Sequence, residues 1–122
     1  MKRWNGWGDA SVHYPLPPSA IDYIDMISGP PTPGVDANLE AVVASVPPTR
    51  LVPHPRVSPD PEERLRHARG QSLPDWIALR SGKPGAFPDG VIYPETEAEV
   101  RSIIGYAQRT GCYLIPYGGG TS

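Results

Sequence analysis

Residues 89–122, DGVIYPETEAEVRSIIGYAQRTGCYLIPYGGGTS, carry the pattern that decides the fold. Val91–Tyr93 is a short β-branched and aromatic run that Pro94 stops, and it predicts a strand. Residues 112–115 are a second run of this kind and predict another strand. Because a helical pattern lies between the two runs, the segment predicts a βαβ unit with a right-handed crossover.

The helix of this unit has clear start and stop signals. Thr96 and Glu99 have the spacing of a capping box, in which each side chain accepts a hydrogen bond from a backbone amide of the first turn. Gly111 is suited to end the helix in a left-handed conformation. The apolar stripe expected to face the sheet consists of Val100, Ile103, Ile104 and Ala107.

A glycine run follows the second predicted strand and is the best candidate for a binding site. Three adjacent glycines can take positive φ and present several backbone N–H groups to one anion, such as a phosphate or diphosphate. Ligands of α/β sheets gather at the carboxyl ends of strands, where this run lies. The candidate cofactor-binding residues are Pro116, Tyr117, Gly118, Gly119, Gly120, Thr121 and Ser122. A plain glycine-rich turn is the alternative, and a P-loop is excluded because no Gly-Lys-Ser/Thr follows at the required spacing.

The part of the chain before the βαβ unit predicts short helices separated by proline. The 122 residues include 17 Pro and 13 Gly, and residues 1–58 hold most of the prolines, which forbid long elements. Ser19 is expected to cap a short helix, and residues 35–46 predict a second one. Further on, Asp60 is a candidate N-cap for a helix with the body 64–69. Ser72, with Asp75 three residues later, predicts another that ends at Gly82.

Charge and composition exclude several classes of function. A formal net charge of -2 rules out an overall electrostatic footprint for nucleic acid or an anionic membrane. The single cysteine, Cys112, is expected in a buried strand and excludes an internal disulfide framework. No stretch approaches the length of a membrane span, and residues 4–9 lack the apolar run of an export signal, so we expect a cytoplasmic protein. The three histidines lack metal-ligand spacing, and no residue set predicts a metal site or covalent catalysis.

Two further groups of side chains are expected to be structural. A small basic cluster is expected to form a solvated face paired with Glu62 and Glu63, with anion binding as the alternative; it consists of Arg64, Arg66, His67 and Arg69. The tryptophans Trp4, Trp7 and Trp76 are expected to be packing anchors.

Three separated segments resemble one enzyme family. FPDGVIYP (87–94), the capped helix and IPYGGGTS (115–122) are similar to the opening of the FAD-binding domain in the vanillyl-alcohol-oxidase and p-cresol-methylhydroxylase (PCMH) flavoprotein superfamily. Within it, RHARGQSL (66–73) and RWNGWGD (3–9) resemble bacterial relatives of alkyldihydroxyacetonephosphate synthase. The resemblance spans most of the chain and is weakest between residues 10 and 58.

The resemblance implies an α+β chain with two parts. Residues 1–86 would be a helical, proline-rich amino-terminal extension, and residues 87–122 the first βαβ unit of a PCMH-type FAD-binding domain, truncated inside its cofactor loop. The cofactor would be FAD, with the loop from Pro116 to Ser122 around its diphosphate. The chain would then be an amino-terminal fragment, inactive alone, with the catalytic residues beyond Ser122.

The implied function is that of an alkylglycerone-phosphate synthase in ether-lipid synthesis, which exchanges an acyl for an alkyl chain on dihydroxyacetone phosphate. The resemblance implies a small-molecule or lipid-precursor substrate, a homodimer when full length and a possible peripheral membrane contact. One alternative is an FAD-dependent 2-hydroxy-acid dehydrogenase or oxidase acting on D-lactate or glycolate. The other is a non-enzymatic proline-rich interaction module, since Pro15 with Pro18, and Pro30 with Pro33, have P-x-x-P spacing.

Overall fold

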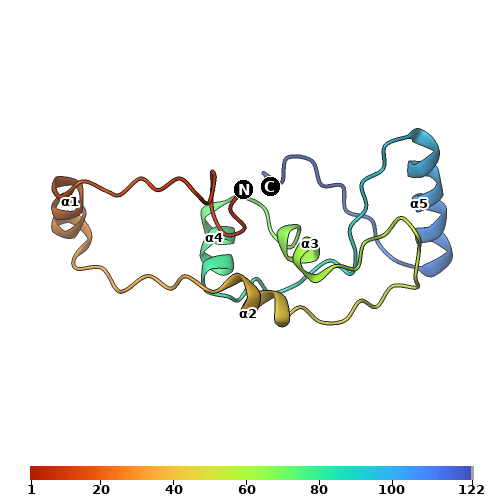
Figure 1. The fold of residues 1–122 in the computed structure, drawn as a ribbon, viewed down its shortest axis with the longest axis horizontal. Coiled ribbons are helices and arrows are strands. Elements are labelled where there is room, and N and C mark those ends of the chain that lie inside the picture. The colour runs from red at the N-terminus through yellow and green to blue at the C-terminus, as the bar shows by residue number, and fades with distance from the viewer. Residues whose placement is uncertain (122) are drawn as a thin grey trace.

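The computed structural model describes residues 1–121 and is an elongated arrangement of five short helices (Figure 1). The helices are α1 (Pro18–Ser28), α2 (Leu39–Ala44), α3 (Pro61–Arg66), α4 (Leu73–Arg80) and α5 (Glu97–Thr110). Along the longest axis, α1 lies at one end and α5 at the other, with α2, α3 and α4 between them (Figure 1).

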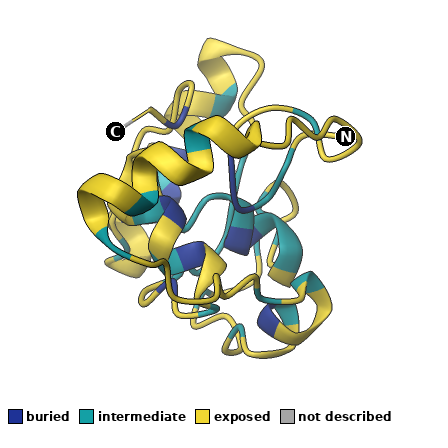
Figure 2. Ribbon diagram, turned by 90° about the vertical axis from the view of Figure 1, so that its left-hand side faces the viewer, coloured by how far each residue is buried: buried dark blue, intermediate teal, exposed yellow. Residues whose placement is uncertain are grey.

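The core lies among the three central helices, where α2 and α3 pack together. Four buried side chains form it, contributed by α2, α3 and α4: Val42, Leu65, Trp76 and Leu79. Trp4, Phe87 and other partly buried apolar residues surround this cluster. Most of the remaining residues are exposed (Figure 2). Because this core is small, the stability of the fold depends strongly on a few polar contacts between its loops.

Most of the predicted helix starts are confirmed. The side chain of Asp60 accepts from the Glu63 amide at 2.9 Å. Ser72 and Asp75 form a complete capping box at the start of α4. In α5, Thr96 accepts from the amide of Glu99, and Gly111 ends the helix with a φ of 69°. In each case the donor and acceptor are three residues apart, which makes the signal readable from sequence.

Several details of the predicted helices are wrong. Ser19 is not a cap: α1 begins at Pro18, whose fixed φ suits the first turn, and no side chain caps it. The predicted helix 35–46 is shorter, because the Asn38 side chain caps it by accepting from the amide of Ala41. The body of α3 lies earlier than 64–69, directly after its cap. The Glu99 carboxylate accepts from the amide of Glu95 and not from that of Thr96, so the α5 cap is not reciprocal.

The two end helices bury little apolar surface. α1 has no buried residue, and its three isoleucines, Ile21, Ile24 and Ile27, are all exposed. α5 buries Ile103, Tyr106 and Ala107, and the Tyr106 hydroxyl donates to the carbonyl of Val52 at 2.6 Å. Two members of the predicted stripe, Val100 and Ile104, are 41% and 44% exposed. The face of α5 predicted to cover a sheet is therefore only half covered.

The predicted strands do not form a sheet within residues 1–121. Val91 makes an isolated antiparallel bridge with Ser58, with mutual backbone hydrogen bonds of 2.8 and 2.9 Å. Residues 112–115 are outside any strand. Two parallel strands with one crossover helix lack the neighbouring strands and second helical layer that stabilise such a sheet. The βαβ arrangement therefore stays a prediction.

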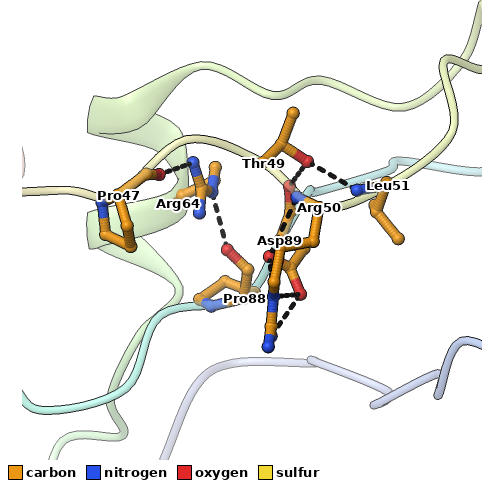
Figure 3. A network of polar contacts seen from close by, with 7 residues as sticks. All are labelled: Pro47, Thr49, Arg50, Leu51, Arg64, Pro88 and Asp89. Carbon is orange, nitrogen blue, oxygen red and sulfur yellow. Dashed lines mark hydrogen bonds and ion pairs between the residues drawn. The ribbon is translucent and has the colours of Figure 1, made fainter.

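Arg64 ties the loop after α2 to the start of the segment 87–94. This side chain is 1% exposed, and its guanidinium donates to the carbonyls of Pro47 and Pro88, both at 2.7 Å (Figure 3). Beside it, Arg50 forms a bidentate ion pair with Asp89, and Thr49 donates to the Asp89 carbonyl at 2.7 Å (Figure 3). These contacts fix where the chain enters the segment that leads to α5.

Candidate functional site

The glycine run turns sharply at its last glycine. Gly118 and Gly119 are exposed, whereas Gly120 is buried and has a φ of 69°, in the left-handed region that favours glycine. A Cβ at Gly120 would collide with the Tyr117 hydroxyl. The sequence predicted positive φ within the glycine run, and in the structure Gly120 adopts it. Ser122, the last predicted site residue, lies outside the described residues.

The run rests against residues 66–71. The Gln71 side chain donates from Nε2 to the carbonyl of Gly119 at 2.7 Å. The Tyr117 ring packs edge-on against His67, with the ring centroids 4.6 Å apart and the planes at 61°. The Tyr117 hydroxyl also lies 3.4 Å from the Arg66 carbonyl. The end of α3 and the segment just after it therefore pack against the predicted cofactor loop.

His67 is held in one orientation by two hydrogen bonds. Its Nδ1 lies 2.7 Å from the Glu63 carbonyl, and its Nε2 lies 3.2 Å from the Tyr93 hydroxyl. Because a carbonyl only accepts, Nδ1 carries a proton, and in the neutral ring Nε2 then accepts from the Tyr93 hydroxyl. Desolvation of the phenol, and the hydrogen bond and charge of the nearby Glu63 carboxylate, raise the pKa of Tyr93. His67, Tyr93 and Tyr117 thus form one aromatic cluster.

The backbone amides of the glycine run fit an anionic ligand. Within residues 1–121, no protein acceptor receives a hydrogen bond from the amides of Gly118, Gly119 and Gly120. A backbone amide that has no protein acceptor takes one from water or from a ligand. The diphosphate of a dinucleotide supplies such acceptors, so the loop residues fit FAD.

The nearby arginines do not add free positive charge to this loop. Arg66 pairs with Glu62 at 2.6 Å in the same helix. Arg69 donates to the Pro84 carbonyl at 2.6 Å and lies 3.7 Å from an Asp75 carboxylate oxygen. Arg64 is enclosed in the protein interior, so its predicted place on a solvated face is wrong. An anion at the loop would therefore be held mainly by backbone amides.

Other candidate groups lead to no site. No cluster of three or more His, Cys, Asp or Glu side chains suited to a metal occurs in the described part of the chain. Cys112 is only partly buried, in contrast to the buried position expected for it. Of the expected tryptophan contacts, Trp76 is buried and Trp7 packs edge-on against it at 5.9 Å while 61% exposed. Among residues 1–121, no helix has the length and apolar character needed to cross a membrane.

The sequence did not identify the contacts beneath the loop. Gln71 and His67 belong to the segment RHARGQSL, for which the sequence predicted no contact with the glycine run. Their contact with the glycine run joins residues 48 or more positions apart. No local pattern encodes such a pairing.

Three curated proteins similar to this chain share one name, alkyldihydroxyacetonephosphate synthase. The chain is 44% identical to the Caenorhabditis elegans protein over 59 residues, which are 48% of this chain and 10% of that relative. Over 59 residues it is 34% identical to the Dictyostelium discoideum protein, again 48% of this chain and 10% of the relative. Its match to the Trypanosoma brucei brucei protein is 26% identical over 152 aligned positions, covering 98% of this chain and 25% of the relative.

The chain thus spans between a tenth and a quarter of the length of these relatives. No protein-family model matches it. No solved structure matches it either. The local matches and the match along nearly the whole chain confirm the resemblance identified from the sequence: this chain is similar to proteins named alkyldihydroxyacetonephosphate synthase.

Proposed function

We propose that this chain is the amino-terminal part of an FAD-dependent enzyme of the alkylglycerone-phosphate synthase type. The observation that carries the proposal is its similarity to three proteins named alkyldihydroxyacetonephosphate synthase, at up to 44% identity. The glycine run supports the FAD part of the proposal, because its amides have no protein acceptor within residues 1–121. Residues 87–122 would begin a PCMH-type FAD-binding domain, and residues 1–86 would be its extension.

In this proposal the loop holds the diphosphate of FAD. The amides of Gly118, Gly119 and Gly120 would donate to phosphate oxygens, and the Thr121 hydroxyl could add a further donor. When bound, FAD would supply the isoalloxazine ring at which the exchange chemistry takes place. We assign no catalytic residue to this chain.

The proposed overall reaction is an exchange at one carbon of dihydroxyacetone phosphate. The bond between that carbon and the acyl oxygen breaks, and a bond to the oxygen of a fatty alcohol forms. The fatty acid leaves with the proton of the alcohol, so no electron is gained or lost overall. The loop contributes binding and orientation of the cofactor to this reaction.

The direct test uses the complete protein that contains these residues. After purification we expect a flavin absorbance spectrum, and incubation of acyl-dihydroxyacetone phosphate with labelled fatty alcohol should yield labelled alkyl product and free fatty acid. A protein without flavin, even after addition of FAD, would contradict the proposal. Turnover of D-lactate or glycolate with a dye acceptor, without alkyl exchange, would favour the hydroxy-acid dehydrogenase alternative.

A matched pair of glycine variants tests the role of the loop. In the complete protein, Gly120→Ala places a methyl group against the Tyr117 hydroxyl at a positive φ, so FAD affinity should fall on the order of tenfold. Gly34→Ala is the control, because no atom lies within 4 Å of the added Cβ there. Equal FAD dissociation constants for the two variants, measured by flavin fluorescence, would show that the loop is not part of the cofactor site.

Three further properties remain predictions of this proposal. They are a homodimeric assembly of the complete protein, a cytoplasmic location with peripheral membrane contact, and a small-molecule or lipid-precursor substrate. Sedimentation of the complete protein would test the first, and flotation with phospholipid vesicles the membrane contact.

A further inference from the structure

The hydrogen bond from Gln71 to Gly119 fixes the orientation of one peptide unit in the loop. Gln71 lies in the extension, between α3 and α4, and its Nε2 is 2.7 Å from the Gly119 carbonyl oxygen. In a trans peptide the carbonyl and the following N–H point in opposite directions. Because the carbonyl of Gly119 points to Gln71, the amide of Gly120 points away from the extension.

Within residues 1–121, that amide donates to no protein acceptor, as described above. Gly120 is buried, and its positive φ is tied to the close approach of Tyr117. Rotation of the Gly119–Gly120 peptide would exchange the positions of carbonyl and amide. It would also direct a partial negative charge toward an anionic ligand. Gln71 opposes this rotation, because the hydrogen bond from its Nε2 to the Gly119 carbonyl would have to break.

His67 supports the same arrangement at the start of the run. The ring packs against Tyr117, three residues before Gly120, and is itself held by the Glu63 carbonyl and the Tyr93 hydroxyl. The start of the loop is thus packed on His67 and its centre is hydrogen-bonded to Gln71. Both side chains come from residues 66–71, just after α3.

We propose that Gln71 is a positioning residue for the cofactor, with His67 in support: it orients the Gly119–Gly120 peptide so that the Gly120 amide donates to the diphosphate of FAD. This inference rests on the proposed function and adds a specific role for the extension. The extension would then determine cofactor affinity without touching the flavin ring.

The test uses Gln71→Glu in the complete protein, since a carboxylate has nearly the shape of the amide but cannot donate when ionised. We expect an FAD dissociation constant about tenfold higher than that of the unaltered protein. Gln71→Lys restores a donor and should return affinity to within roughly threefold. Gln108→Glu, the same substitution at an exposed position of α5, is the matched control and should leave affinity unchanged.

A second measurement does not need bound cofactor. In the FAD-free protein, the backbone order parameters of Gly119 and Gly120 measured by NMR should be lower in Gln71→Glu than in Gln71→Lys, because only the lysine variant retains the hydrogen bond to the Gly119 carbonyl. The melting temperature of both variants should remain close to that of the parent, since Gln71 lies outside the buried core.

The possible failures are distinguishable. If the unaltered protein binds no FAD, the proposed function fails. If it binds FAD but Gln71→Glu binds equally tightly, the positioning role is wrong and the proposed function stands. Equal losses in the glutamate and lysine variants would likewise overturn the positioning role, since hydrogen-bond donation would then be irrelevant.

Discussion

At the scale of single residues, Arg64 contributes most clearly to stability. Its guanidinium is buried and donates to two carbonyls of separate loops, those of Pro47 and Pro88 (Figure 3). Arg64→Ala leaves both acceptors without this donor inside the protein, so we expect a loss of about 3 kcal/mol in the free energy of unfolding. Urea denaturation followed by circular dichroism measures this loss.

A surface arginine provides the control for this measurement. Arg101 pairs with Glu97 within α5, and both side chains are more than three-quarters exposed. Arg101→Ala should therefore change the unfolding free energy by less than about 0.5 kcal/mol. If the two alanine variants were equally stable, Arg64 would not act as a clamp between the loops.

The neighbouring ion pair makes stability depend on acid pH. Hydrogen bonds from Arg50 lower the pKa of Asp89 below its ordinary value of 3.8, with a smaller contribution from Arg64. A carboxyl group whose pKa is lowered in the folded protein stabilises it above the unfolded pKa and loses this effect as pH falls through the folded pKa. Stability should thus decline below about pH 4, and Asp89→Asn should make that decline shallower.

Arg50→Ala removes the main cause of the lowered pKa of Asp89. It should therefore make the decline of stability at acid pH shallower, as Asp89→Asn does. The double variant should match either single variant. Arg101→Ala, whose partner is Glu97, should keep the parent profile. An unchanged slope in Asp89→Asn would show that other carboxyl groups cause the decline.

The sequence predicted the conformation or environment of a single residue only where that residue's contacts are close in sequence. The left-handed glycine before Thr121 was anticipated, because three adjacent glycines indicate a need for positive φ. Arg64 was expected on a solvated face along with the other basic residues of RLRHAR. Its acceptors lie 17 and 24 residues away, and nothing in the local pattern separates a buried arginine from its exposed neighbours.

At the scale of secondary-structure elements, helix starts were predicted best. The caps at Asp60, Ser72 and Thr96 each join atoms three residues apart, so residue type and spacing determine them. The predicted bodies were less accurate, as the short α2 shows. A cap fixes the first turn, whereas the length of a helix depends on packing partners distant in sequence.

Replacing glycine by alanine should change stability with opposite signs at two positions, one inside α5 and one at its C-cap. Gly105 lies inside the helix, where a Cβ would meet only the end of the flexible Arg109 side chain, so Gly105→Ala should stabilise the protein by about 0.5–1 kcal/mol. Gly111 has a φ of 69°, so Gly111→Ala should destabilise it by roughly 1 kcal/mol. Thermal unfolding of both variants gives the signs, and a shared sign would contradict the assignment of Gly111 as the helix terminus.

At the scale of the whole molecule, the sequence predicted a sheet that residues 1–121 do not form. Strand formation requires hydrogen-bonded neighbours, and Val91 finds its neighbour in Ser58, not in residues 112–115. Apolar side chains on the unpaired segment are consequently exposed, including Tyr113 at 94% and Ile115 at 85%. An α-helix satisfies its own backbone, which explains why α5 forms here although the sheet does not.

The exposed segment 112–115 gives a test of the proposed FAD-binding domain. Its side chains are apolar on both faces of an extended chain, with Tyr113 and Ile115 on one and Cys112 and Leu114 on the other, a pattern typical of a strand buried in a parallel sheet. In the isolated 122-residue chain we expect these amides to exchange hydrogen at nearly the rate of an unfolded peptide. In the complete protein they should exchange on the order of a hundredfold more slowly, because neighbouring strands would accept their hydrogen bonds. The α5 amides near the buried Tyr106 are the internal reference. Equally fast exchange of Tyr113–Ile115 in both samples would rule out the second strand, and with it the βαβ unit that the glycine loop is proposed to terminate.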